Sequence, residues 1–161
     1  MSNSPDSGRE FLRHTLATLA YRGGKVLRDS PPGFATLAST DGSRSPIEIL
    51  AHIGDLLEWT LHLTEGRHTW TERQAESWDA EVDRFFELLR KVDARLVAPE
   101  PLAAPVENLF QGPVADALTH IGQLALLRRR AGSPVKGENY FKAEIVAGRV
   151  GPEQAGPKRE F

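Results

Sequence analysis

The chain has 161 residues, which suits one domain, and its composition excludes several classes of protein. Lysine and arginine (20) nearly balance aspartate and glutamate (22), so no strong positive field exists to hold nucleic acid. The lack of cysteine excludes disulfides, thiolate zinc sites and a protein thiol nucleophile. No apolar run approaches roughly 18 residues and the start lacks a signal-peptide pattern, so we expect a soluble, cytoplasmic protein without membrane contact.

The first predicted helix covers about residues 8–29, where apolar residues recur every three to four positions. The adjacent glycines Gly23 and Gly24 weaken its second half, because glycine costs roughly 1 kcal/mol relative to alanine in a helix interior. Pro31 and Pro32 then end the helix, since proline cannot continue one. We therefore expect a long first helix that is prone to bend near its end.

The second predicted helix has the clearest start in the chain. Ser45 is placed as the N-cap, Pro46 at the first helical position and Glu48 at the third, which together form a capping box. An apolar stripe continues from there to about residue 66. His52 lies inside this stripe rather than opposite it, which predicts a buried histidine.

Two further helices complete the predicted set. The third runs from about Glu72 or Ser77 to Leu96, with a charged outer face. The fourth begins with Pro113 at its first position and closes near residue 132. Its apolar stripe has His120 on its shoulder and residue 116 slightly further out, so both are expected at the edge of the core.

The end of the chain contains a basic cluster and a segment of weak pattern. Arg128, Arg129 and Arg130 fall in the last turn of the fourth helix, where cations favour exposed carbonyls, so we interpret them as a solvated helix end. A stretch from Tyr140 to Val146 predicts a short packed helix. The predicted organisation is all-α: a four-helix bundle domain with this short C-terminal helix over residues 1–148, and a loosely ordered tail over residues 149–161.

Three residues from two helices form a candidate metal site. Asp116 and His120 are four apart, so their side chains leave the same helix face. If His52 comes across from the second helix, two imidazoles and one carboxylate meet one ion and leave its other side open. Such a set suits Zn, Fe or Ni in a catalytic rather than a closed structural site. Asp55 would orient the His52 ring, and Trp59 would form a pocket wall or pack in the core.

Each of these residues also has a simpler explanation on its own. A histidine in an apolar stripe, such as His52, is usually a hydrogen-bonded core residue. Asp116 is a first-turn acid that favours the helix dipole, and His120 alone would be another partly buried histidine. Only the combination points to a metal. A serine hydrolase is not indicated, because no Gly-x-Ser-x-Gly turn occurs.

Two runs of sequence resemble a known family. They are Pro46-Ile-Glu-Ile-Leu-Ala-His52-Ile-Gly-Asp-Leu-Leu-Glu-Trp59 and Asp116-Ala-Leu-Thr-His120-Ile-Gly-Gln-Leu-Ala-Leu-Leu-Arg-Arg-Arg-Ala-Gly-Ser-Pro134. In these runs the chain resembles the DinB/YfiT-like superfamily, to which the N-terminal domain of mycothiol-dependent isomerases is related. The similarity extends over about residues 8–147.

The resemblance implies a four-helix bundle in up-down-down-up order, often dimeric. It also implies a zinc or nickel ion held by a histidine of the second helix and two residues four apart on the fourth, which carries over to His52, Asp116 and His120. Many members have histidine where this chain has Asp116. The thiol-dependent isomerase branch has a carboxylate there, usually the longer glutamate.

The expected function is a metal-dependent enzyme that activates water or a low-molecular-weight thiol for attack on an electrophilic small molecule. The resemblance implies a bacillithiol- or mycothiol-type cosubstrate, and no catalytic residue is assigned beyond the metal ligands. One alternative is a non-catalytic metal-binding or stress-associated bundle. Another is a helical dimerisation module without metal. The resemblance implies a homodimer, formed through helices that carry surplus apolar residues such as Phe85 or Phe86, although core packing also explains both residues.

Overall fold

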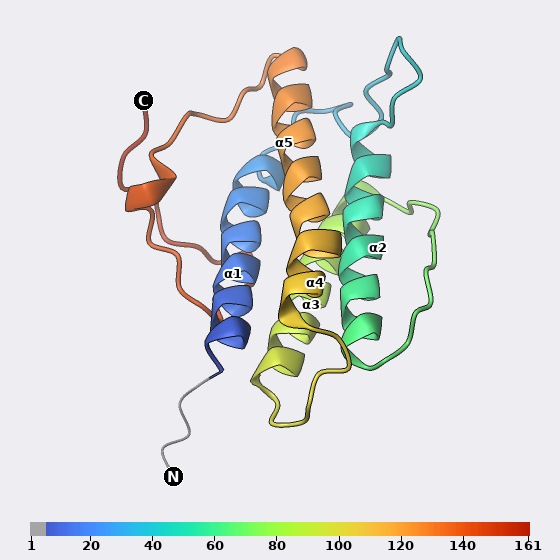
Figure 1. Ribbon diagram of the computed structural model, residues 1–161. Coiled ribbons are helices and arrows are strands. Elements are labelled where there is room, and N and C mark those ends of the chain that lie inside the picture. The colour runs from blue at the N-terminus through green and yellow to red at the C-terminus, as the bar shows by residue number, and fades with distance from the viewer. Residues whose placement is uncertain (1–5) are drawn as a thin grey trace.

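The helices of this chain pack side by side as a bundle (Figure 1). The computed structural model describes residues 6–161, and its long helices are α1 (Ser7–Leu27), α2 (Pro46–Thr64), α3 (Trp78–Val97) and α5 (Ala115–Arg130). Within these described residues there is no strand, only an isolated bridge between Glu138 and Glu160. None of their helices is long and apolar enough to cross a membrane. The prediction of an all-α helical bundle is confirmed at this level.

Local side-chain chemistry explains where the first two helices begin. The Asp6 carboxylate accepts a hydrogen bond from the backbone N–H of Gly8 at 3.0 Å, which satisfies a free donor in the first turn of α1. At α2 the backbone N–H of Ser45 donates to the Glu48 carboxylate at 2.7 Å, and Pro46 occupies the first helical position. The predicted capping box therefore fixes the entry of α2, about two turns before His52.

A short helix precedes the fourth predicted helix. This helix, α4 (Val106–Leu109), leads into the turn Phe110–Val114, and the chain kinks at Gly112, whose φ of −89° and ψ of −105° are not helical. Pro113 directly follows the kink, which agrees with the prediction that it occupies the first position of the next helix, continued as α5. A proline has no N–H to donate, so it fits at the start of a helix, where that N–H would have no partner. The kink therefore places Asp116 in the first turn of the helix that follows.

One buried cluster of apolar side chains joins the long helices. Contacts between helix ends show how they pack. The Arg9 guanidinium at the start of α1 donates to the carbonyl of Ala98, just after α3, at 2.7 Å. Near the end of α3, Arg95 donates to the carbonyl of Thr64, the last residue of α2, at 3.3 Å.

Phe85 and Phe86 belong to this core. Both rings are buried, and their centroids lie 5.0 Å apart in an edge-to-face arrangement. Neither ring is available on the surface, so both are explained as core residues, and the homodimer stays a prediction. The larger exposed aromatic side chains of the bundle include Phe11 and Phe110, whose ring centroids lie 6.5 Å apart.

Arg128 is the main departure from the sequence-based picture of the basic cluster. It is only 4% exposed, although we expected a solvated side chain. Its guanidinium donates to the carbonyls of Val26 and Arg28 at 2.7 and 2.8 Å, and to that of Asp29 at 3.2 Å. These carbonyls lie at the end of α1 and just beyond it, so Arg128 satisfies acceptors that the first helix leaves free. It thus ties the end of α5 to the end of α1.

The segment after α5 makes contacts that its composition did not predict. A turn of 3₁₀-helix forms at Tyr140–Lys142, within the stretch where we expected a short helix. The buried Glu138 carboxylate accepts hydrogen bonds from Tyr21 at 2.5 Å and from Lys25 at 2.8 Å. Beyond it, Glu160 also bonds to Lys25, and Val150 joins the core. Residues expected as a loose tail are therefore held against α1 by an ion-pair cluster.

Alanine substitutions at the two adjacent glycines of α1 are expected to change the free energy of unfolding in opposite directions. A Cβ at Gly23 would lie 2.7 Å from Cζ of the buried Phe85, whereas a Cβ at Gly24 would meet only Phe86, at an ordinary 3.6 Å. We expect Gly23→Ala to lower the free energy of unfolding by about 1–2 kcal/mol through overpacking. Gly24→Ala should raise it by up to roughly 1 kcal/mol through helix propensity. Urea denaturation of the two variants measures both, and equal shifts would contradict the close approach at Gly23.

The role of Arg128 is tested by removing its donors. Arg128→Met leaves the carbonyls at the end of α1 without partners, and we expect it to lower the free energy of unfolding by roughly 1–3 kcal/mol. The matched control is Arg129→Met, which removes the same charge from an exposed neighbour on the same turn. Thermal and urea denaturation should show little change for the control. Equal losses in both variants would mean that charge rather than hydrogen bonding matters here.

Candidate metal centre

The packing of α2 against α5 brings the three predicted ligands together. His120 Nε2 lies 3.4 Å from Asp116 Oδ1, and His52 Nε2 lies 3.8 Å from Asp116 Oδ2. One ligand atom from each residue lies within 4.8 Å of the other two. The two imidazole rings meet edge to face with centroids 4.8 Å apart. These residues come from positions far apart in the chain and converge on one point.

The geometry fits a single divalent ion. Two ligand atoms each roughly 2.1 Å from a tetrahedral ion are about 3.4 Å apart, which is the separation between His120 and Asp116. His52 stands further off, with Nε2 at 3.8 Å from Asp116 Oδ2, and its side chain would have to move closer to join the same ion. Two imidazole nitrogens with one carboxylate oxygen suit Zn, Ni or Fe rather than Mg or Ca.

The site is closed on its histidine side and open at the carboxylate. The side chains of His52 and His120 are 15% and 14% exposed, whereas that of Asp116 is 48% exposed. A hollow of about 430 Å³ adjoins Asp116 and has Trp59, Gln111 and other residues of α2, the turn Phe110–Val114 and α5 as its walls. A structural zinc site is normally closed by four protein ligands, and a catalytic one keeps a position for water or substrate. The exposure pattern is that of an open site.

Gln123 orients the second imidazole. The Nδ1 atom of His120 lies 2.8 Å from Oε1 of Gln123, one turn further along α5. An amide oxygen only accepts, so Nδ1 carries the proton and Nε2 of a neutral ring presents a lone pair to Asp116. A metal ion would accept this lone pair together with an oxygen of Asp116, which lies 3.4 Å from Nε2.

His52 is held differently. Burial lowers the pKa of this imidazole, and the positive charge of Arg44 and the neighbouring His120 lower it further. The ring therefore favours the neutral form, which is the form that binds metals. Its Nδ1 atom is buried and has no hydrogen-bond partner among the described residues. The indole of Trp70, from the link at residues 65–77, packs edge to face on it at 5.8 Å.

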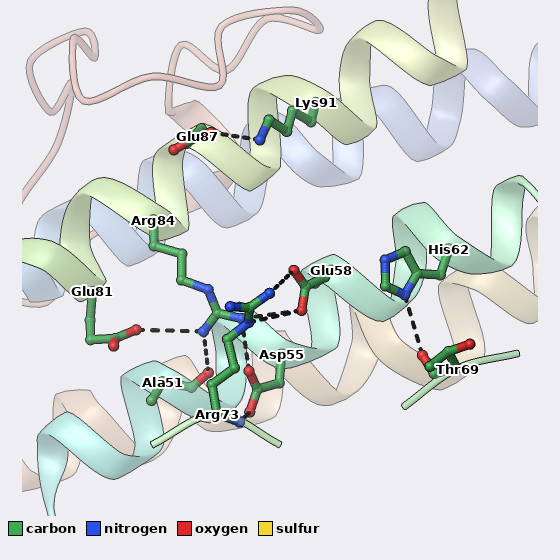
Figure 2. A network of polar contacts seen from close by, with 10 residues as sticks. All are labelled: Ala51, Asp55, Glu58, His62, Thr69, Arg73, Glu81, Arg84, Glu87 and Lys91. Atoms are coloured by element: carbon green, nitrogen blue, oxygen red, sulfur yellow. Dashed lines mark hydrogen bonds and ion pairs between the residues drawn. The ribbon is translucent and has the colours of Figure 1, made fainter. Parts of the chain in front are cut away.

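Asp55 does not orient His52 as the sequence suggested. Figure 2 shows its carboxylate among the guanidinium groups of Arg84 and Arg73. It accepts from Arg84 Nη2 at 2.8 Å and from the backbone N–H of Arg73 at 3.1 Å. Arg73 also bonds to Glu58 at 2.7 Å. Asp55 thus anchors α3 and the link at residues 65–77 to α2, and both its oxygens are in use.

Trp59 lies between the core and the hollow beside Asp116. Its ring is partly buried against the core cluster, and it also lines the hollow beside Asp116. It contacts Trp70 edge to face with centroids 5.6 Å apart. The two indoles and His52 therefore form a continuous aromatic row along α2.

Sequence reasoning missed two neighbours of the site. Gln123 could have been found, because a polar residue three positions after His120 shares its helix face. Trp70 had no such signal, since it lies in an irregular link without periodicity. Only the path of the link along α2, fixed by Arg73, places it on His52.

Comparison with protein-family models, with curated proteins and with solved structures finds no match to this chain.

Gln123 provides a sharp test of this local geometry. Gln123→Leu removes the acceptor that fixes the His120 ring, so we expect zinc affinity to fall about 10- to 100-fold, as for other outer partners of metal-bound histidines. Gln123→Glu keeps an acceptor and should retain the affinity of the parent. Competition with a chromophoric chelator measures both values. An unchanged affinity in Gln123→Leu would contradict an orienting role for this hydrogen bond.

Proposed function

We propose that His52, Asp116 and His120 hold one divalent metal ion, zinc or nickel, and that the chain is a metal-dependent enzyme of the DinB/YfiT-like type. The reaction is attack by water or a low-molecular-weight thiol on an electrophilic small molecule. The observation that carries this proposal is the convergence of the three ligand atoms within 4.8 Å beside a half-exposed carboxylate. With no match to known proteins, the family assignment rests on the residues themselves.

The proposal includes the up-down-down-up order of helices that this resemblance implies. Three contacts between helix ends support it. The start of α1 meets the end of α3, and the end of α3 meets the end of α2. The end of α5 meets the end of α1 through Arg128. In this order α2 and α3 run in the same direction, which agrees with the long link at residues 65–77 returning along α2.

The residues around the site support external nucleophiles. A divalent ion, when bound, supplies Lewis acidity that lowers the pKa of a coordinated water or thiol. The chain has no cysteine, so a thiol has to come from a cosubstrate. The half-exposed side of Asp116 and the adjoining hollow of about 430 Å³ provide its approach, and Trp59 offers an apolar wall against which a small substrate can pack.

A second candidate function is a metal-binding bundle without catalysis. It is favoured by the walls of the hollow beside Asp116, where the aspartate itself is the one titratable side chain. No separate acid or base stands there to transfer a proton. A non-catalytic bundle would bind the ion without converting any substrate, so the two candidates differ in a measurable way.

Metal content and turnover test the proposal together. We expect about one zinc or nickel per chain after reconstitution of the parent. His52→Ala, Asp116→Ala and His120→Ala should each lose most of it while retaining helical content, because each removes one of three ligands. The control is His14→Ala, which removes an exposed histidine of α1 far along the chain from the site. Elemental analysis and circular dichroism provide the measurements.

The second half of this experiment separates the two functions. The loaded parent is incubated with a thiol and an electrophile such as 1-chloro-2,4-dinitrobenzene, and conjugate formation is followed by absorbance. Turnover that is lost in the three ligand variants supports the enzyme. Stoichiometric metal without turnover across a panel of thiols and electrophiles favours the non-catalytic bundle. No metal in the parent, or metal unaffected by all three substitutions, would refute both.

A further inference from the structure

A hollow beside His120 differs from that beside Asp116 in the charge of its walls. It has a volume of about 500 Å³, within the range of small-molecule sites. It lies between α5 and the loop before α2, with Arg44 from the loop and Arg130 from the end of α5 among its walls. His120 and Gln123 also line it, so it reaches the metal centre directly. We propose that this hollow is an anion-binding subsite in which Arg44 and Arg130 bind a carboxylate of the small molecule that reacts at the metal centre.

The identity of the reacting molecule rests on the proposed function, whereas the charges in the walls of the hollow do not depend on it. Arg44 has a weak internal partner: its Nη2 atom lies 3.8 Å from Glu72, and both side chains are largely in solvent. Arg130 forms no ion pair with any described residue. Exposed pairs such as Arg44 with Glu72 contribute little. Both guanidinium groups are therefore available to a ligand, and a guanidinium binds a carboxylate through two parallel hydrogen bonds.

One carboxylate also lines the hollow, but its oxygens are partly satisfied. Asp41 accepts hydrogen bonds from the hydroxyls of Ser39 and Ser43, and these bonds hold the pKa of Asp41 well below its usual range. Asp41 is thus ionised, and it offsets one of the two arginines. A single positive charge remains in the hollow, which suits an anionic ligand rather than a cationic one.

Three other hollows within the described residues lack this surplus. The one beside Asp116 has no basic side chain in its walls. A smaller one of about 160 Å³ beside His52 shares Arg44 with the hollow next to His120, but its walls carry three carboxylates, Glu48, Asp55 and Glu72. A further one beside Phe11 and Phe110 is mainly apolar. Of these four hollows, the one next to His120 has the walls that favour an anion most.

The position of Arg130 at a helix end suggests a simpler role, which a matched control can test. Cations favour the last turn of any helix, and Arg129 occupies the same turn. Arg130 lines the hollow and Arg129 does not. If the helix dipole explains both side chains, Arg129→Gln and Arg130→Gln have the same effect on anion binding. If the hollow is a subsite, only Arg130→Gln has one.

The first arm of the test uses the full chain without metal, so that it does not depend on the metal site. Succinate is titrated into ¹⁵N-labelled protein, with uncharged succinamide as the matched probe, and amide shifts around His120 and Gln123 are followed. We expect saturable shifts with succinate alone. Arg44→Gln and Arg130→Gln should each weaken its binding about tenfold, the equivalent of one charge-assisted hydrogen bond. Asp41→Asn should strengthen it, and Arg129→Gln should leave it unchanged.

The second arm uses the zinc-loaded full chain and asks which molecule carries the anion. Binding of 3-mercaptopropionate is compared with that of its methyl ester by calorimetry. If the acid binds more tightly than its ester, and this difference disappears in Arg44→Gln, the anion belongs to the thiol and the subsite is supported. Equal affinities in this arm, with succinate saturable in the first, support the subsite and place the anion on the electrophile.

The proposal and the function beneath it fail in different ways. No saturable response to succinate, or equal losses in Arg129→Gln and Arg130→Gln, would overturn the subsite whatever the metal content. Absence of metal from the parent would refute the proposed function. Succinate binding in that case would still support the anion subsite, because the first arm is carried out without metal.

Discussion

The candidate site depends on the register of α5 against α2. Along α5 the buried residues Ala117, Ile121 and Leu124 recur at helical spacing and join the common core. Asp116 and His120 each precede one of them by a single position, so core packing places this pair at the edge of the interface. A shift of α5 by one residue would rotate the pair by about 100° and carry it away from His52. The apolar contacts of α5 therefore determine whether Asp116 and His120 lie beside His52 or whether His52 stands alone.

The start of α5 explains how this register is reached. A regular helix through Pro113 would lack one backbone bond and force the proline ring against the preceding turn. The kink at Gly112 avoids this misfit, because its non-helical backbone separates α4 from the helix that begins at Pro113. Asp116 lies in the first turn of that helix, where a carboxylate also favours the helix dipole. The first-turn acid and the metal ligand are thus compatible explanations of the same residue.

Features that follow from local spacing could be predicted from the sequence, whereas those that depend on the path of a link could not. The capping box at Ser45, the burial of His52 and the shared face of Asp116 and His120 all follow from periods within one helix. The burial of Arg128 did not, because its acceptors belong to the end of a helix about a hundred residues earlier. The bend expected at residues 23 and 24 was likewise inferred without knowledge of a distant partner. The ring of Phe85 fills the space that a side chain at Gly23 would need.

The two histidines of the site are fixed by different forces, and this difference has consequences for metal binding. His120 has a directional hydrogen bond to Gln123 on its own helix, so its orientation persists whether or not α2 moves. His52 has no such bond among the described residues and is positioned by burial and by the edge of Trp70. Trp70 in turn depends on the anchoring of its link through Asp55. The pair on α5 is therefore preorganised. In the proposed metal site, His52 would be the ligand that adjusts its distance to the ion, because packing tolerates a small displacement that a hydrogen bond does not.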